Sequence, residues 1–430
     1  MKKKIFALFF AVFLFQAGFG LYYAISEHKR GQYFDPLAPS SEYFQHQILD
    51  AWNAPRAWGD LEAYNRAAYS LITRHGFETL DGQPSAWVTP GFPAFLALLY
   101  SAFGYHFFAV LFFNALCVTL AYAALSQLGA RVFSSATGIT TFILLCLNLR
   151  MSMFVGYIYT ESLFVSILAL TLYGAVEIYR NPAKRWPAFL ALGLLSGFGV
   201  LVRPAFLGVV PVVALFLFFR SRGGLRKNFL STLLYGLTSL SLLTAWVVRN
   251  QTLLGEPLVT TNSVYALSEG NQDFYKAFTF GDVYKNAPSQ TPYGPLPPVL
   301  ASENRELKDA LFLRDQFREW KSKNSRFYLW LTTWRFKSFW MPYTADMSPR
   351  NQAISLFLWL IIFPAGLLGW YRNRKDPVAW LFGLSTVGLI ALPSLVVVGP
   401  SLRYQLPAQI LLSLLAATEY ARIAARARVQ

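Results

Sequence analysis

The sequence predicts an all-α polytopic membrane protein with about ten transmembrane helices. Only 14% of its 430 residues are charged, against about 25% in soluble domains, and its mean hydropathy is +0.37. Apolar runs of roughly 17 to 25 residues, long enough to cross about 30 Å of hydrocarbon, recur along the chain. The predicted spans are 5–25, 106–127, 133–149, 162–179, 186–202, 204–219, 229–248, 352–370, 378–398 and 408–421.

The first span has two interpretations, because a secretory signal peptide also begins with a basic segment and an apolar run. Here Lys2, Lys3 and Lys4 precede the run 5–25, and no clear small-x-small cleavage pattern lies before Ser26. The run is about 20 residues long, which is enough to cross a bilayer. We therefore expect it to remain as a membrane anchor.

The distribution of Lys and Arg predicts the topology. Membrane proteins retain basic residues on the cytoplasmic side, so a cytoplasmic amino terminus predicts that alternate connections are basic. This register places both termini in the cytoplasm of a protein of the inner (plasma) membrane, and it accounts for the net charge of +16 without nucleic-acid binding. The basic residues that fit it are Lys2, Lys3, Lys4, Arg131, Arg180, Lys184, Arg185, Arg220, Arg222, Arg226, Lys227, Arg372, Arg374, Lys375, Arg422, Arg426 and Arg428.

Two long connections then lie on the periplasmic side and leave room for polar structure. Short apolar or aromatic stretches within them, 92–103 and 327–340, are too short or too charged to span and are typical of interfacial helices. The Pro-rich stretch 288–298 predicts a loop. The predicted organisation is a first transmembrane helix (1–25), a first periplasmic loop with a candidate catalytic acid (26–105), transmembrane helices 2–7 (106–248), a second large periplasmic loop (249–351), and transmembrane helices 8–10 with a basic cytoplasmic tail (352–430).

Ionisable residues beside or within apolar spans are costly, which makes them candidates for function. In this register they gather on the periplasmic side. Each can also have a purely structural role: an Arg at a helix end can anchor at the interface, and Asp60 or Glu161 can stabilise a helix amino terminus. The candidates are Asp60, Glu62, Glu161, Arg203, Arg249, Arg403 and Tyr404.

Metal and disulfide chemistry have little support. The four histidines, His28, His46, His75 and His106, lack ligand spacing, and Cys117 and Cys146 lie in apolar runs without a neighbouring ligand. We expect no metal and no cofactor.

Six short motifs follow one another along the chain: some are acidic, one is Pro-Gly-aromatic-Pro, and the others contain Arg. They are Gly59-Asp60-Leu61-Glu62-Ala63-Tyr64, Pro90-Gly91-Phe92-Pro93, Thr160-Glu161, Val202-Arg203-Pro204, Trp246-Val247-Val248-Arg249-Asn250 and Arg403-Tyr404-Gln405-Leu406-Pro407. In this order they resemble the bacterial GT-C membrane glycosyltransferases, the superfamily of protein O-mannosyltransferases and the lipid A aminoarabinose transferase, that is, a glycosyltransferase family 39-like protein. The resemblance covers nearly the whole chain.

The resemblance implies an inverting glycosyltransferase that uses a polyprenyl-phosphate sugar donor. Asp60 matches the family's acidic position best and is the implied base. Glu62, two residues later on a helix, would point about 200° away from it. Arg203 and Arg403 are the leading phosphate partners, with Glu161 and Arg249 in support, because guanidinium groups pair well with phosphate oxygens. Tyr404 either orients the phosphate or packs.

Two other functions remain open. A flippase or transporter is expected to place ionisable groups near the bilayer midplane and to show two similar halves, neither of which is evident. A lipid-linked glycan polymerase or ligase also uses periplasmic arginines, but its main periplasmic loop typically comes late in the chain. The expected partners are the lipid-linked donor, membrane lipids and an acceptor that is a lipid, a glycan or a protein.

Overall fold

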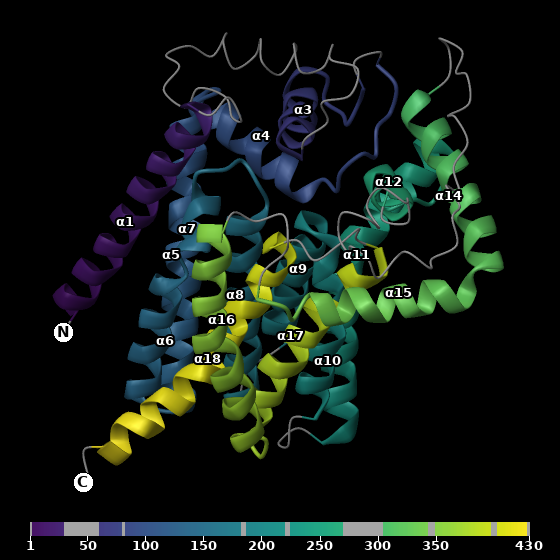
Figure 1. Ribbon diagram of the computed structural model, residues 1–430. Helices are drawn as coiled ribbons and strands as arrows, with labels where there is room; N and C mark the ends of the chain where they lie inside the picture. Colours follow the sequence, from purple (N-terminus) through teal and green to yellow (C-terminus); the bar gives the residue numbers. More distant parts are fainter. Residues whose placement is uncertain are drawn as a thin grey trace.

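The computed structural model describes residues 2–29, 60–79, 82–181, 186–219, 224–269, 304–342, 349–396 and 402–427, and this part is almost entirely helical. Its only extended pairing is an isolated bridge between Glu78 and Pro84. A bundle of long helices forms the body of the protein, and a layer of shorter helices covers one end of it (Figure 1). The all-α, multi-pass membrane fold is thus confirmed.

The bundle contains a helix for each of the ten predicted spans. Its elements are α1 (Lys2–Lys29), α5 (Phe107–Val132), α6 (Ser135–Leu147), α7 (Leu149–Val155), α8 (Glu161–Arg180), α9 (Trp186–Val202), the 3-10 helix η1 (Pro204–Gly208), α10 (Val210–Phe218), α11 (Leu225–Leu254), α16 (Pro349–Arg372), α17 (Pro377–Val396) and α18 (Leu402–Ala427).

Among the described residues, six helices are long and apolar enough to cross a membrane: α1, α5, α8, α11, α16 and α17. A seventh span forms if α6 and α7, which meet at a bend of 60°, are taken together. The helix α9 and the η1–α10 pair are apolar but shorter. The helix α18 is long but carries charged residues near both of its ends.

The helix α8 lies at the centre of the bundle. Within its apolar window 72% of the residues are buried, against 17% for α11, which lies at the periphery. α8 packs against α5 and α9, and α9 packs against α11, where Gly193 and Gly197 face the backbone of α11. Because α8 is central, its first residue, Glu161, is placed in the interior of the protein.

The layer at one end of the bundle, called here the polar layer, consists of α3 (Asp60–Thr73), α4 (Gly91–Phe103), α12 (Thr261–Glu269) and α14 (Arg305–Lys323). It comes from the two long connections of the sequence. The helix α15 (Ser325–Ser338) follows α14 and lies across the direction of the long helices (Figure 1). The predicted short helices at 92–103 and 327–340 therefore exist as α4 and α15, while the predicted loop at 288–298 lies outside the described residues.

The Pro-Gly-aromatic-Pro motif seats α4 against the end of α9. A Cβ atom on Gly91 would come within 2.6 Å of the backbone of Leu201 and Val202, so no larger residue fits without displacing a helix. Phe92 is fully buried beside it, and its ring meets the ring of Tyr64 of α3 edge to face, 5.1 Å between centroids. Through these contacts α3 and α4 are held beside the residue that follows Val202, which is Arg203.

Candidate active site

Glu161 is the first residue of α8 and is completely buried. A carboxylate at a helix amino terminus is favoured by the helix dipole, as the sequence suggested. The dipole alone does not balance a charge in the protein interior, because an unpaired buried carboxylate carries a large desolvation cost. The side chains that contact Glu161 therefore matter for the stability of this site.

Two arginines meet at one oxygen of this carboxylate. Arg403 donates from Nε to Glu161 Oε1 at 2.6 Å, and Arg203 donates from Nη1 to the same oxygen at 3.3 Å. The side chains of Arg403 and Arg203 are 21% and 10% exposed. We call these three residues the Glu161 cluster. Two cations share one anion, so the cluster carries a net charge of +1.

The chain reaches this arrangement at two helix ends. Arg203 is the residue between α9 and η1, where Pro204 cannot continue the hydrogen bonding of α9. Arg403 lies in the first turn of α18. The two arginines approach Glu161 from sequence positions 42 and 242 residues away.

Aromatic rings hold both guanidinium groups. Arg203 lies over the ring of Tyr404, with Cζ 4.3 Å from the ring centroid, and Arg403 lies over Tyr159 at 4.2 Å. A cation over the face of an aromatic ring is stabilised electrostatically, more so where water is excluded. The ring of Tyr404 thus packs against the guanidinium of Arg203.

The cluster has unused acceptor capacity. Glu161 Oε2 and the hydroxyl of Thr160 are both buried, and neither has a hydrogen-bond partner among the described residues. Buried polar atoms in proteins are nearly always satisfied by protein, water or ligand. The surplus positive charge suits a bound anion, whereas Glu161 Oε2 needs a hydrogen-bond donor such as a hydroxyl group.

Asp60 is the first residue of α3, and its side chain lies outside the described part of the chain. Glu62 is half-buried and lies one helical turn before Arg66. Burial lowers the pKa of Arg66 to about 10, while the nearby carboxylates of Glu306 and Glu62 act in the opposite direction. Glu62 therefore lies in the field of an arginine of its own helix.

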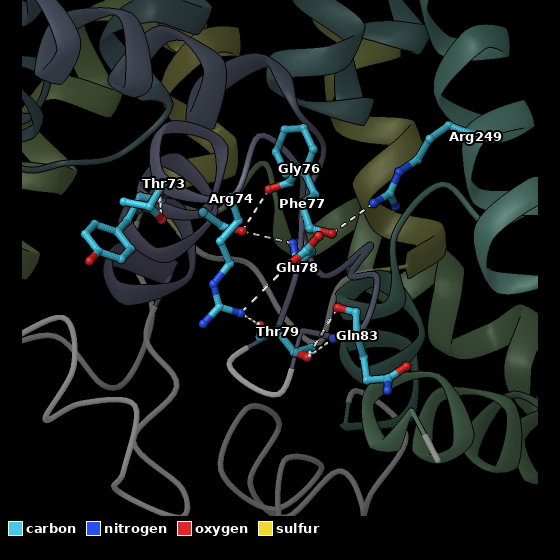
Figure 2. A network of polar contacts seen from close by, with 10 residues as sticks. Thr73, Arg74, Gly76, Phe77, Glu78, Thr79, Gln83 and Arg249 are labelled. Atoms are coloured by element: carbon cyan, nitrogen blue, oxygen red, sulfur yellow. Dashed lines mark hydrogen bonds and ion pairs between the residues drawn. The ribbon is translucent and has the colours of Figure 1, made fainter. Parts of the chain in front are cut away.

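Arg249 occupies a different place from the Glu161 cluster. It donates from Nη2 to the carbonyl of Phe77 at 2.9 Å and from Nη1 to the carbonyl of Ser85 at 2.8 Å. Figure 2 shows its guanidinium pointing at the backbone of Phe77, in the same segment whose Thr79 and Gln83 hydrogen-bond to each other. These contacts clamp the segment between α3 and α4, so the structure gives Arg249 a loop-holding role.

Glu306 of α14 completes this clamp from the other side. Its carboxylate accepts from the hydroxyl of Ser85 at 2.6 Å, the amide of Ala86 at 3.0 Å and the hydroxyl of Thr261 at 2.6 Å. One carboxylate thereby joins α14, α12 and the α3–α4 segment. The helices of the polar layer are therefore joined by hydrogen bonds to a charged group, which are stronger than hydrogen bonds between neutral groups.

Sequence reasoning missed one residue, Arg150, which is 7% exposed near the start of α7. The available signal was an arginine immediately after an apolar run, between Leu149 and Met151.

Among the described residues no group of three or more His, Cys, Asp or Glu side chains is arranged to hold a metal ion.

The family model for dolichyl-phosphate-mannose-protein mannosyltransferase matches residues 87–248. This range includes Glu161 and Arg203 and excludes Asp60 and Arg403. Among solved structures, the chain is similar to ArnT from Cupriavidus metallidurans bound to undecaprenyl phosphate, with a TM-score of 0.37 and 12% identity over 90% of this chain and 78% of that chain.

The apo form of ArnT from Cupriavidus metallidurans gives a TM-score of 0.36 and 12% identity, over 88% of this chain and 76% of that chain. These values are too low to relate individual residues of the two proteins. A search of curated proteins found no match to the sequence.

Proposed function

We propose that this chain is a membrane glycosyltransferase of the GT-C superfamily and that it moves a sugar from a polyprenyl-phosphate-linked donor to an acceptor with inversion at the anomeric carbon. The observation that carries the proposal is the Glu161 cluster, in which two arginines share one buried carboxylate and retain a net positive charge. Arginines of this kind suit a phosphate group, which accepts hydrogen bonds from the guanidinium edge.

The proposed reaction is a single displacement. The acceptor oxygen forms a bond to the anomeric carbon as the bond between that carbon and the phosphate oxygen breaks, and the electron pair of the broken bond stays on the phosphate. The acceptor proton passes to a carboxylate, for which Asp60 is the candidate. The phosphate changes from a diester with one negative charge to a monoester with up to two, so positive charge beside it stabilises the transition state more than the donor.

Glu161 is unsuited to be that base. Its Oε1 already accepts hydrogen bonds from both Arg203 and Arg403, so this oxygen is engaged in holding the two guanidinium groups. We assign it to hold the two arginines in position. The phosphate-binding groups are then Arg403 and Arg203, and the chemistry needs no cofactor or metal, since a phosphate leaving group requires little protonation.

An apolar pocket beside the cluster suits the lipid chain of the donor. It lies between the residues that follow α15 and the helices α16, α17 and α18, and its lining includes Phe339, Trp340, Trp359, Ile390 and Gln405. Gln405 follows Arg403 by two residues, and the ring of Phe339 packs edge to face against Tyr404, with centroids 6.3 Å apart. A phosphate at the arginines could therefore have its hydrocarbon chain in this pocket.

The proposal is tested with purified protein in liposomes, supplied with a panel of polyprenyl-phosphate sugars and candidate acceptors, with donor consumption followed by mass spectrometry. Consumption of one donor with release of polyprenyl phosphate is the expected result. Movement of the intact donor between leaflets without consumption would instead identify a flippase, and growth of a glycan chain on the lipid would identify a polymerase.

The role of Arg403 predicts a graded effect. Arg403→Ala should reduce donor use more than Arg403→Lys, because Lys keeps the charge but loses the planar fork that contacts two oxygens at once. The measurement is the initial rate at several donor concentrations. Equal and negligible effects of the two changes would make Arg403 a surface anchor.

The proposed location is the inner membrane, with both termini in the cytoplasm and the polar layer in the periplasm. In a background lacking Cys117 and Cys146, cysteines at positions Ser289 and Ser401 should react with an impermeant thiol reagent in intact cells, whereas one at Ser221 should not. Labelling at Ser221 with the other two protected would reverse the orientation.

A further inference from the structure

Arg150 is a buried arginine that the proposed reaction does not use. It lies on α7, directly after the 60° break that separates α7 from α6. It is 7% exposed, and its Nη2 atom has no hydrogen-bond partner among the described residues. No carboxylate in the described part of the chain forms an ion pair with it. Its charge is therefore unbalanced by the protein described.

An unbalanced guanidinium in this setting is costly. Moving a charged group from water into a protein interior costs free energy unless a partner of opposite charge compensates. The amide of Asn148, at the break, is also fully buried with neither polar atom paired among the described residues. Broken helices at membrane depth are tolerated where they are buried in protein or line a cavity or ligand site.

A series of neighbouring aromatic rings connects α7, the helix of Arg150, to the Glu161 cluster. Phe154 lies four residues after Arg150, on the same face of α7. The ring of Phe154 is 6.3 Å from that of Tyr159, and Tyr159 carries the guanidinium of Arg403 on its face at 4.2 Å. Tyr157 stacks on Tyr159 at 5.1 Å. Arg150 is thus one helical turn from Phe154, whose ring neighbours the Tyr159 ring that carries Arg403.

We propose that Arg150 is a third arginine for a lipid-linked phosphate, and that its charge is balanced only when that anion is bound. The inference rests on the proposed function for the identity of its ligand. It also fits the charge change of the reaction. Arg203 and Arg403 together with Glu161 offer one net positive charge, whereas the product phosphate monoester carries up to two negative charges, and Arg150 supplies the second positive charge.

The test exploits the cost of the unpaired charge. Arg150→Met keeps an unbranched side chain and removes the charge, so the ligand-free variant should melt at a higher temperature than the unaltered protein in neutral detergent. Undecaprenyl phosphate should stabilise the unaltered protein, and its affinity for Arg150→Met should fall by about tenfold or more, because hydrogen bonds to charged groups are lost. Arg150→Lys should bind with intermediate affinity.

Two comparisons identify the ligand source. Undecaprenol, which lacks the phosphate, should bind Arg150→Met and the unaltered protein alike. Phosphatidylglycerol tests binding of a membrane phospholipid. If Arg150→Met loses affinity for phosphatidylglycerol but not for undecaprenyl phosphate, Arg150 still binds an anion, but that anion is a phospholipid. The matched control is Arg131→Met, since Arg131 is 47% exposed and pairs with Glu177 at 2.6 Å; it should leave the affinity for undecaprenyl phosphate unchanged.

A structural role gives the opposite signature. If Arg150→Met melts at a lower temperature and binds both phosphate lipids as the unaltered protein does, Arg150 is a packing residue and the inference is wrong. Binding of neither phosphate lipid to the unaltered protein overturns it as well. Sugar transfer is measured separately, so an affinity loss in a protein that transfers no sugar would defeat the proposed reaction and leave the phosphate site standing.

Discussion

Asp60→Asn is expected to lower the rate of sugar transfer by about 10² to 10⁴-fold, the range typical for loss of a general base. Asn cannot accept the acceptor proton, but its side-chain oxygen caps a helix nearly as well as that of Asp. Asp60 is the first residue of α3, so a cap and a base are both compatible with its place. The variant should therefore purify with near-normal yield and thermal stability and still bind the lipid-linked donor.

Glu62→Gln is the matched control for this change. Glu62 lies one helical turn before Arg66, and its charge acts on the pKa of that arginine against the effect of burial, so Glu62 already has an electrostatic role within α3. Its substitution should have a much milder effect on transfer. Near-normal transfer by Asp60→Asn would reduce Asp60 to a helix cap, and a dead Glu62→Gln variant would move the base to Glu62.

Glu161→Gln is expected to lower the stability of the protein by about 3 to 5 kcal/mol, the range for removing one partner of a buried ion pair. The reason is that Arg203, 10% exposed, and Arg403, 21% exposed, would lose the carboxylate that they share. Transfer should fall with it, because the arginines would no longer be held in one geometry. Thermal unfolding and the transfer rate measure the two effects.

A second substitution separates charge from packing. In Glu161→Gln combined with Arg203→Met, one of the two unbalanced charges is removed, so part of the lost stability should return while transfer stays low. Glu177→Gln is the control, since Glu177 pairs with Arg131 at 2.6 Å but both side chains are more than a third exposed. Exposed pairs contribute about 0 to 1 kcal/mol. Equal stability losses at Glu161 and Glu177 would mean that the Glu161 pair is screened by water.

The helical elements could be predicted from the sequence because they depend on local patterns. Apolar runs of sufficient length placed a helix at each of the ten predicted spans, and Pro204 after Arg203 placed the end of α9. The number of helices that are long enough to span a membrane follows less directly from these local patterns. α7 bends away from α6 by 60°, and α9 and α10 are shorter than a full span.

The contacts of the polar residues could not be read from the same patterns. An arginine at a helix end looks alike in sequence whether it pairs with a buried carboxylate, as Arg203 does, clamps backbone carbonyls, as Arg249 does, or lies buried without a described partner, as Arg150 does. The same holds for Tyr404, whose ring supports Arg203.

Hydropathy and charge along the chain are enough to predict a multi-pass helical membrane protein and to select the ionisable residues that are costly enough to suggest function. The contact of Glu161 with Arg203 and Arg403 could be seen only in the folded protein, because it depends on how α8, α9 and α18 pack across separations of 42 and 242 residues. Hydrophobic periodicity fixes which face of a helix is buried, but many packings bury the same faces. Which polar side chains then meet is settled by the packing that forms.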